Sequence, residues 1–384
     1  MRQPVISFHK IRHCQEYALC FPVKFEIIDC MRIAMLAPFE EPVPPKKYGG
    51  TELVIYNLIT ELVKMGHDVT LFGTGDAEVP CRLEAIFPAS IRTLPPFDTD
   101  QKAREAVKWV GIGNVLRKLA NEPFDIIHNH NGWRFLSVSS CVRRPIVTTL
   151  HGPMDQVYQQ VVFSSSPDFA FISISDNQRV AYPTLQYVQT VYNGIDVSKF
   201  PFSEKAGGYL CLLGRFSPEK GVKEAIKIAR MTGMPLKIAA KIDFVDRQFY
   251  ESVKPEIDGR QIQFVGEISF EEKTDLLKNA YALLAPIQWE EPFGLNVIES
   301  MACGTPVVGT KRGSFPELIE QGKTGFLGTT AEELASFVSH IPMIKRLDCR
   351  KAVEERFTST IMAEGYLQAY QRVLEKFGTG KNSV

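Results

Sequence analysis

Along most of this chain, short apolar runs alternate with longer stretches in which apolar residues recur every three or four positions. The run RIAMLAP predicts a strand, and the stretch TELVIYNLITELVKMG predicts a helix with Ile55, Leu58, Ile59 and Leu62 on one side. Further strands are predicted at HDVTLFG, FDIIHNH, PIVTTLHG, FAFISIS and VQTVYNG, and a second helix near residues 101–119. Apolar strands separated by amphipathic helices are typical of a parallel α/β sheet.

The alternation stops between residues 193 and 208 and then restarts. That segment holds turn residues, a proline, charges and paired glycines without a sustained apolar period, so we interpret it as a linker. Beyond it, strands are predicted at YLCLLG, PLKIAAK, IQFVG, YALLAPI, TPVVGT and TGFL, and helices at GVKEAIKIARMTG, FEEKTDLLKNA, GLNVIESMACG and SFPELIEQG. We therefore predict an α/β fold with two doubly wound, Rossmann-like domains, at residues 31–200 and 201–360.

The first thirty residues do not share this pattern. Charged residues interrupt every apolar stretch there, so we find no apolar core of a signal peptide. Met31 then opens the first predicted strand. We expect residues 1–30 to be an extension produced by a misassigned start, with Met31 the natural one; a disordered arm is the alternative.

Composition narrows the functional classes. The 44 Lys and Arg residues equal the 44 Asp and Glu residues, which gives no reason to expect a nucleic-acid partner. The 8 cysteines form no C-x-x-C pair and are scattered, as in a reduced cytoplasmic protein without a structural zinc site. No apolar run is long enough to cross a membrane. We expect a cytoplasmic globular protein.

The most specific segment spans residues 288–310, QWEEPFGLNVIESMACGTPVVGT. A predicted strand meets a tight Pro-Phe-Gly loop, and a helix begins near Asn296, so free N–H groups of its first turn face an anion such as a diphosphate. Gly294 lets the backbone approach that anion closely. Glu291 precedes the turn, and Glu299, on the first helical turn, could accept two hydrogen bonds from a ribose diol. The alternative is structural: Asn296 as helix cap, with Glu299 completing a capping box.

This string, E-P-F-G-L-x-x-x-E followed by A-x-G-T-P-V-V, resembles the E-x7-E signature of the retaining glycosyltransferases of family 4, which have the GT-B fold. Four further segments resemble motifs of the same family, and they lie in both predicted domains. They are Tyr48-Gly49-Gly50-Thr51, Leu150-His151-Gly152, Asn193-Gly194-Ile195-Asp196 and the loop from Gly214 to Gly221. The resemblance thus covers nearly the whole chain beyond residue 30.

The resemblance implies an acceptor domain at residues 31–200, a donor domain at 201–360, and a helix at 361–384 that packs back on the first domain. It implies retaining transfer of a hexose from a nucleoside diphosphate sugar, by default UDP-glucose, to a glycan, lipid-linked or small-molecule hydroxyl. The candidate catalytic residues are His151, Arg215, Lys220 and Glu291. The candidate donor-binding residues are Gly49, Gly50, Arg215, Lys220, Glu291, Phe293, Gly294, Leu295, Asn296 and Glu299.

The chemistry of these side chains fits such roles. Arg215 can bind two phosphate oxygens at once and Lys220 adds a compact charge, which also stabilises the departing diphosphate. We assign Glu291 to hydroxyls of the donor sugar, Glu299 to the ribose, and His151 to a sugar hydroxyl or to positioning of the acceptor. Taken singly, each has a structural alternative, as solvent-facing charge or as a histidine that closes a strand.

We expect no obligatory metal and no cofactor beyond the nucleotide sugar. His128 and His130 point to one face if their strand continues and could ligate a metal, but no third ligand is identifiable, so lining the cleft or a structural hydrogen bond is favoured. Asp98 and Asp100 match the D-x-D of metal-dependent glycosyltransferases, which have another fold. Because a helix follows directly, we interpret them as a helix cap.

Several alternatives stay open. A nucleotide-sugar epimerase, a sugar phosphorylase and a catalytically idle nucleotide-sugar-binding protein have similar architectures. Basic residues and Trp109 on the helix near 101–119 also allow peripheral membrane contact, which we do not favour. No oligomeric state is predicted. A stripe on the last helix, through Met362, Tyr366, Tyr370 and Val373, is predicted to pack on the first domain.

Overall fold

The computed structural model describes residues 30–47, 49–92, 94–165 and 168–380, with side chains up to residue 376. The predictions made for the extension before Cys30 and for Tyr48 therefore lie outside the described residues. The part of the chain that follows Cys30 is described by itself.

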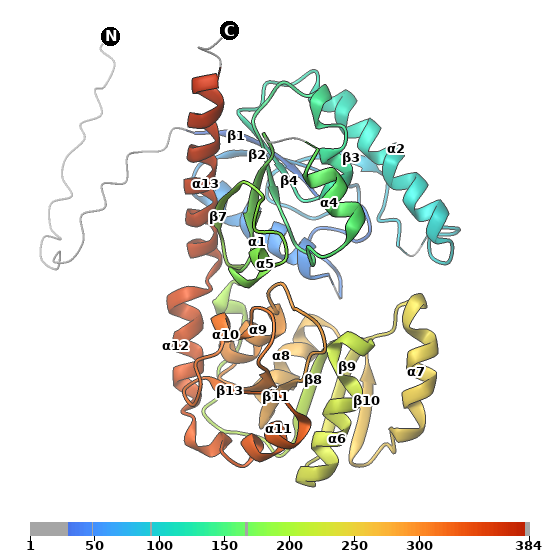
Figure 1. Cartoon of the computed structure of the whole chain (residues 1–384), viewed down its shortest axis with the longest axis vertical. Coiled ribbons are helices and arrows are strands. Elements are labelled where there is room, and N and C mark those ends of the chain that lie inside the picture. Colours follow the sequence, from blue (N-terminus) through green and yellow to red (C-terminus); the bar gives the residue numbers. More distant parts are fainter. Residues whose placement is uncertain (1–29, 48, 93, 166–167, 381–384) are drawn as a thin grey trace, which may run out of the picture. The chain divides into compact units, whose positions relative to one another are not determined.

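The first half of this part forms a sheet of seven parallel strands. Their order across the sheet is β3-β2-β1-β4-β5-β6-β7, so the strand order reverses between β1 and β4 (Figure 1). The bounds are β1 Arg32–Leu36, β2 Asp68–Thr74, β3 Arg82–Phe87, β4 Ile126–Asn129, β5 Ile146–Thr149, β6 Ala170–Ser173 and β7 Tyr187–Thr190.

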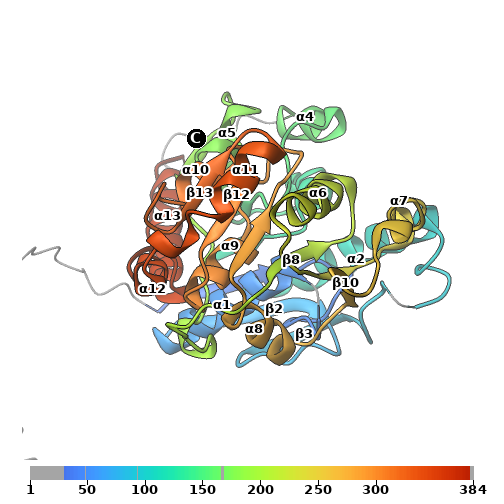
Figure 2. The same ribbon diagram turned by 90° about the horizontal axis from the view of Figure 1, so that it is seen from below.

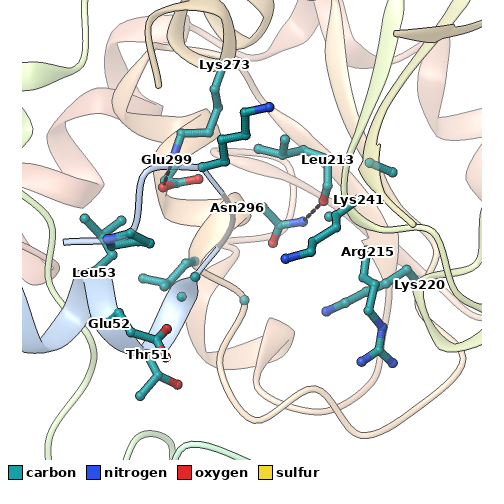
Figure 3. A pocket seen from close by; sticks show the side chains of 18 of the residues that line it. Thr51, Glu52, Leu53, Leu213, Arg215, Lys220, Lys241, Lys273, Asn296 and Glu299 are labelled. Carbon is teal, nitrogen blue, oxygen red and sulfur yellow. Dashed lines mark hydrogen bonds and ion pairs between the residues drawn. The ribbon is translucent and has the colours of Figure 1, made fainter. Parts of the chain in front are cut away.

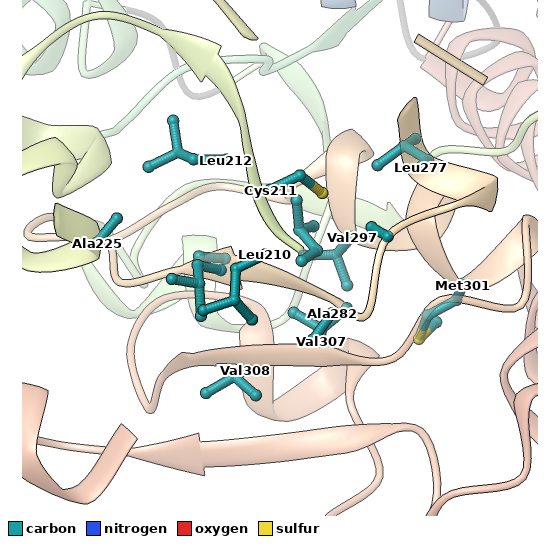
Figure 4. Close-up of a cluster of buried hydrophobic side chains, with 14 of the residues drawn as sticks. Leu210, Cys211, Leu212, Ala225, Leu277, Ala282, Val297, Met301, Val307 and Val308 are labelled. Carbon is teal, nitrogen blue, oxygen red and sulfur yellow. The ribbon is translucent and has the colours of Figure 1, made fainter. Parts of the chain in front are cut away.

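The second half forms a sheet of six parallel strands in the order β10-β9-β8-β11-β12-β13. The bounds are β8 Leu210–Arg215, β9 Leu236–Lys241, β10 Ile262–Gly266, β11 Ala282–Ala285, β12 Val307–Thr310 and β13 Gly325–Gly328. Leu210, Ala282 and Val307 lie in the buried core of this sheet (Figure 4). The two doubly wound, Rossmann-like sheets confirm the predicted fold class.

Helices connect the strands of both sheets. Those of the first half are α1 Gly50–Lys64, α2 Gln101–Leu119, α3 Trp133–Leu136, α4 Val157–Phe163 and α5 Asn177–Val180. Those of the second half are α6 Val222–Thr232, α7 Arg247–Val253, α8 Phe270–Lys278, α9 Leu295–Ala302, α10 Phe315–Leu318, α11 Ala331–Val338, α12 Arg346–Arg356 and α13 Ser359–Gly380. Short 3-10 turns lie at Ser139–Cys141, Val197–Lys199, Pro218–Lys220, Phe244–Asp246, Lys254–Glu256 and Ile341–Met343. In Figure 2, α6 and α11 cover one face of the second sheet, and α8 and α9 cover the other.

The last helix leaves the second half and returns to the first. Helix α13 packs on α1 and on β5 and β7, which confirms its predicted contact with the first domain (Figure 1). The four predicted side chains Met362, Tyr366, Tyr370 and Val373 are all buried. The domain boundaries themselves stay predictions.

The two chain crossings between the halves lie side by side. Ile195 of the linker pairs with Thr358 just before α13, through Ile195 N to Phe357 O and Ser359 N to Ile195 O, each 2.9 Å. A Cβ at Gly194 would lie 2.2 Å from the carbonyl oxygen of Thr358. Only glycine therefore fits this close approach, which holds the linker against the returning helix.

Strand β3 was not predicted from the sequence. It lies at the edge of the first sheet, and Arg82 and Glu84 on it form ion pairs instead of an apolar run. An edge strand does not need apolar residues on both faces, so its sequence lacks the signal that marked the central strands.

Candidate active site

A cavity of 520 Å³ lies between the two sheets (Figure 3). It is lined by residues that directly follow strands of both halves, including His151 after β5, Arg215 at the end of β8 and Lys241 at the end of β9. Carboxyl ends of parallel strands are where such folds bind ligands. All of the candidate residues line this cavity: Gly49, Gly50, His151, Arg215, Lys220, Glu291, Phe293, Gly294, Leu295, Asn296 and Glu299.

The first turn of α9 lies at the cavity. Its cap is Gly294, with φ 94°, and a Cβ there would lie 2.7 Å from Cε1 of Phe315. The helix begins at Leu295, so the alternative of Asn296 as helix cap is wrong. The Asn296 side chain instead donates to the carbonyl of Leu213, 2.9 Å away, and ties the helix start to β8.

Glu299 is the fifth residue of α9, which starts at Leu295, so it lies on the second turn and not on the first as predicted. Its carboxylate is buried and pairs with Lys273 of α8, with 2.5 Å between Nζ and Oε1. Lys273 was not among the predicted site residues. It is a lone lysine on an amphipathic helix, and only the packing of α8 on α9 brings it to the cavity.

Glu291 is held through one of its two oxygens. Its Oε2 forms an ion pair with Lys220 and accepts a hydrogen bond from Trp289 Nε1 at 3.0 Å. The Lys220 ammonium also lies 5.1 Å from the centre of the Trp289 ring. Oε1 has no hydrogen-bond partner within the described residues, so it can accept a hydrogen bond from a ligand. Trp289 was not predicted, although it lies two residues before Glu291.

The cations near β8 and β9 are paired with carboxylates. Arg215 pairs with Glu219, and its Nε lies 3.1 Å from Oδ2 of Asp246. At the cavity rim, Glu41 of the first half accepts Lys241 of the second at 3.0 Å. An anionic ligand such as a diphosphate can take the place of these carboxylates at the cations.

The glycine pair Gly49-Gly50 lies opposite α9. A Cβ at Gly50 would lie 3.3 Å from Cδ1 of Leu295, and one at Gly49 would lie 2.5 Å from Cβ of Pro45. The absence of side chains therefore lets the first half approach the helix start closely. Glu52, in the first turn of α1, also lines the cavity, and its burial raises the pKa of its carboxyl to about 7. Sequence analysis did not single out Glu52.

His151 belongs to a row of three histidine rings. Its Nε2 lies 2.7 Å from Nδ1 of His130, and the His130 and His128 rings contact each other at a tilt of 42°, with centroids 3.9 Å apart. Burial lowers the pKa of His151 to about 4 and the pKa values of His128 and His130 well below the ordinary value, so all three are neutral at pH 7. His128 bonds Tyr370 and Thr149, which is the favoured structural hydrogen bond.

Two motifs were candidates to ligate a metal, the histidines His128 and His130 and the D-x-D of Asp98 and Asp100. Within the described ranges, no three His, Cys, Asp or Glu side chains are arranged to hold a metal ion. Asp100 caps α2, its side chain accepting from Ala103 N at 3.0 Å, as predicted. Neither Asp98 nor Asp100 lines the cavity.

Two facing Rossmann-like sheets, an intervening cavity lined by several cations and a helix that crosses back are the features of the GT-B fold. Residues 48–199 match the family model "Glycosyltransferase Family 4", and residues 197–348 match "Glycosyl transferases group 1". The chain belongs to glycosyltransferase family 4 and transfers a sugar from a nucleotide sugar. None of the helices described here is long and apolar enough to cross a membrane.

Proteins of several specificities are similar to this chain in sequence. The N-acetyl-alpha-D-glucosaminyl L-malate synthase of Bacillus anthracis is 24% identical over 392 residues, covering 87% of this chain and 96% of the relative. A glycogen synthase of Mycobacterium tuberculosis is 26% identical over 345 residues, covering 77% of this chain and 81% of the relative.

Solved structures show the same fold. A sucrose-phosphate synthase from Thermosynechococcus elongatus superposes with a TM-score of 0.75 at 18% identity, covering 90% of this chain and 100% of that one. The Anabaena protein HepE, solved in complex with UDP and glucose, superposes with a TM-score of 0.70 at 19% identity, covering 89% and 99%.

Proposed function

We propose that this chain is a retaining hexosyltransferase that moves a hexose from a nucleoside diphosphate sugar to an acceptor hydroxyl. UDP-glucose is the donor to test first, because a relative of the same fold has been solved with UDP and glucose. The acceptor hydroxyl belongs to a glycan, a lipid-linked sugar or a small molecule.

One observation carries the proposal: motif residues from both halves of the chain meet at a single cavity. The start of α9 offers backbone N–H groups and the positive end of its dipole to a diphosphate. Arg215 and Lys220 add two cations beside it. Glu299 is assigned to the ribose diol and Oε1 of Glu291 to hydroxyls of the hexose.

In the proposed reaction, the bond between the anomeric carbon and the diphosphate oxygen breaks while the anomeric carbon bonds the acceptor oxygen on the same face. The acceptor proton passes to the departing phosphate oxygen, so no enzymic base is required. Lys220, released from Glu291 by the incoming phosphate, and Arg215 stabilise the charge on the diphosphate. In this proposal the cavity holds the acceptor hydroxyl on the same face of the anomeric carbon as the departing diphosphate.

The same cations support transfer without an obligatory metal. Arg215, Lys220 and the dipole of α9 supply the positive charge that a divalent ion supplies in D-x-D enzymes. We expect EDTA to leave the rate of transfer unchanged.

The test is incubation with UDP-glucose, with and without a panel of hydroxyl acceptors and with EDTA, followed by NMR of the products. An α-linked glucoside formed only with an acceptor supports retaining transfer. Release of free sugar or an epimer without acceptor would favour the epimerase. A reaction that requires inorganic phosphate would favour the phosphorylase. UDP binding without turnover of UDP-, GDP- or ADP-sugars on any acceptor would favour the idle protein.

A further inference from the structure

His130 is a buried histidine that the proposed reaction does not use. It directly follows β4, and its backbone N–H bonds Leu36 O of the neighbouring β1 at 3.0 Å. Its Nδ1 lies 2.7 Å from Nε2 of His151, and its Nε2 lies 3.1 Å from Sδ of Met35. Both ring nitrogens of His130 therefore have a hydrogen-bonding neighbour, and one of these neighbours is a thioether sulfur.

The thioether of Met35 decides where the protons lie. A neutral imidazole carries one N–H donor and one acceptor, and a thioether sulfur can only accept. Because Nε2 of His130 faces this sulfur, Nε2 must carry the proton, and Nδ1 is left as the acceptor. Nδ1 then accepts the hydrogen bond that Nε2 of His151 donates, which leaves Nδ1 of His151 without a proton.

The rings are neutral and firmly held. Burial keeps the pKa of each of the three histidines below the ordinary value. His128, whose ring contacts that of His130, lies 2.7 Å from the hydroxyl of Tyr370 on α13 and 2.7 Å from Oγ1 of Thr149. The helix that crosses between the two halves therefore fixes the plane of the ring against which His130 packs.

We propose that His130 is a positioning residue, which holds His151 in the tautomer whose unprotonated Nδ1 accepts a hydrogen bond from a substrate hydroxyl in the cavity. His151 lines the cavity, its Nε2 is used by His130, and its Nδ1 has no hydrogen-bond partner among the residues that the structure describes. Such a nitrogen recognises an O–H group and repels a carboxylate or phosphate oxygen, which has no proton to donate. This inference rests on the proposed function for the identity of the substrate.

The tautomer is measured directly by 15N NMR of the full chain labelled at histidine, with the His151 signals assigned by their loss in His151→Asn. We expect a protonated Nε2 and an unprotonated Nδ1 on His151. In His130→Phe, which keeps a ring but offers no acceptor, we expect a mixture of both tautomers. In His130→Asn, whose amide oxygen can stand near the former Nδ1, we expect the original tautomer.

Met35→Leu is a second variant of nearly unchanged volume, and it removes the sulfur that orients His130. We expect it too to mix the tautomers of His151. A proton on Nδ1 of His151 in the unmodified chain would overturn the inference, as would an unchanged tautomer in both His130→Phe and Met35→Leu.

Kinetics separate positioning from a purely structural role. We expect His130→Phe to lower kcat about tenfold, the rate equivalent of one hydrogen bond, with KM for the nucleotide sugar little changed and with recovery in His130→Asn. Equal loss in both variants would contradict positioning. Because the NMR result needs no turnover, absence of transfer in the unmodified chain would refute the proposed function and leave the tautomer test intact.

Discussion

The cations that the second half contributes to the cavity already have carboxylate partners. Lys220 pairs with Glu291, Lys273 with Glu299, and Arg215 with Glu219. In the free protein these pairs leave none of the three cations without an anionic partner. In the proposed complex the donor diphosphate takes the place of carboxylates at these cations, and Glu291 and Glu299 accept hydrogen bonds from sugar hydroxyls.

The role of Glu299 predicts a preference for ribose over deoxyribose. If its carboxylate accepts from the ribose diol, the unmodified chain should bind UDP about tenfold more tightly than 2′-deoxy-UDP, the worth of one hydrogen bond. Glu299→Ala should bind both nucleotides alike. Calorimetric titration of the four combinations checks this, and a preference that survives in Glu299→Ala would remove Glu299 from the ribose site.

The histidine row predicts acid sensitivity of the fold. The pKa of His151 falls from 6.5 unfolded to about 4 folded, so below pH 6.5 the unfolded state binds more protons, and stability is lost as pH falls toward 4. The slope is about 1.4 kcal/mol per pH unit for each such histidine. Glu52, whose pKa is raised from 4.5 to about 7, opposes this with one proton in the same window.

Urea unfolding at pH 7 and pH 5 measures the net change in the free energy of unfolding from these opposing groups. His128 and His130 add to the loss, because burial also lowers their pKa values. Between pH 7 and pH 5 the free energy of unfolding should fall less in His130→Asn than in the unmodified chain, by the contribution of one histidine. A loss that is the same with and without His130 would contradict the neutral buried row.

At the scale of elements, helices and strands were predictable from the sequence when they are long and buried on at least one face. Helix α2 was predicted with the bounds it has, because its nineteen residues span several helical turns and Asp100 marks its start. The edge strand β3 and the seven-residue helices α4 and α7 were not predicted, because short or solvent-facing segments carry little periodicity. Residues such as Lys273, Trp289 and Glu52 reach the site only through the packing of their elements.

The close contact between Gly194 in the linker and Thr358 before α13 can be tested by mutation. Gly194→Ala places a Cβ 2.2 Å from Thr358 O and must separate the linker from the start of α13. We expect a loss of about 2 kcal/mol or more in the free energy of unfolding. Gly208→Ala, in the same linker with nothing within 4 Å of its added Cβ, is the matched control. Equal stabilities of the two variants in urea unfolding would show that this contact is not tight.

At the scale of the whole described chain, the fold was predictable because two series of strands and helices each specify one doubly wound sheet. The eleven candidate residues were predictable because each lies at or after the end of a strand or in the first two turns of a helix, and such positions converge at the carboxyl edge of a parallel sheet. The pairing of cations with carboxylates and the proton positions on the histidines were not predictable, because they depend on contacts between residues far apart in the sequence.

Ion pairs also join the two halves at the rim of the cavity. Arg92 of the first half lies 2.8 Å from Asp243 of the second, and Glu41 forms ion pairs with both Arg92 and Lys241.

The most direct test of the account is calorimetric titration of UDP, in EDTA, into the unmodified chain, Lys220→Ala and Lys227→Ala. Lys227 is a matched control, because its ion pair with Glu332 is exposed and neither residue lines the cavity. We expect the unmodified chain and Lys227→Ala to bind UDP equally, and Lys220→Ala to bind at least about tenfold more weakly, the worth of one charge-assisted hydrogen bond. Equal binding by all three folded proteins, or none by the unmodified chain, would contradict the assignment of the cavity as the donor site.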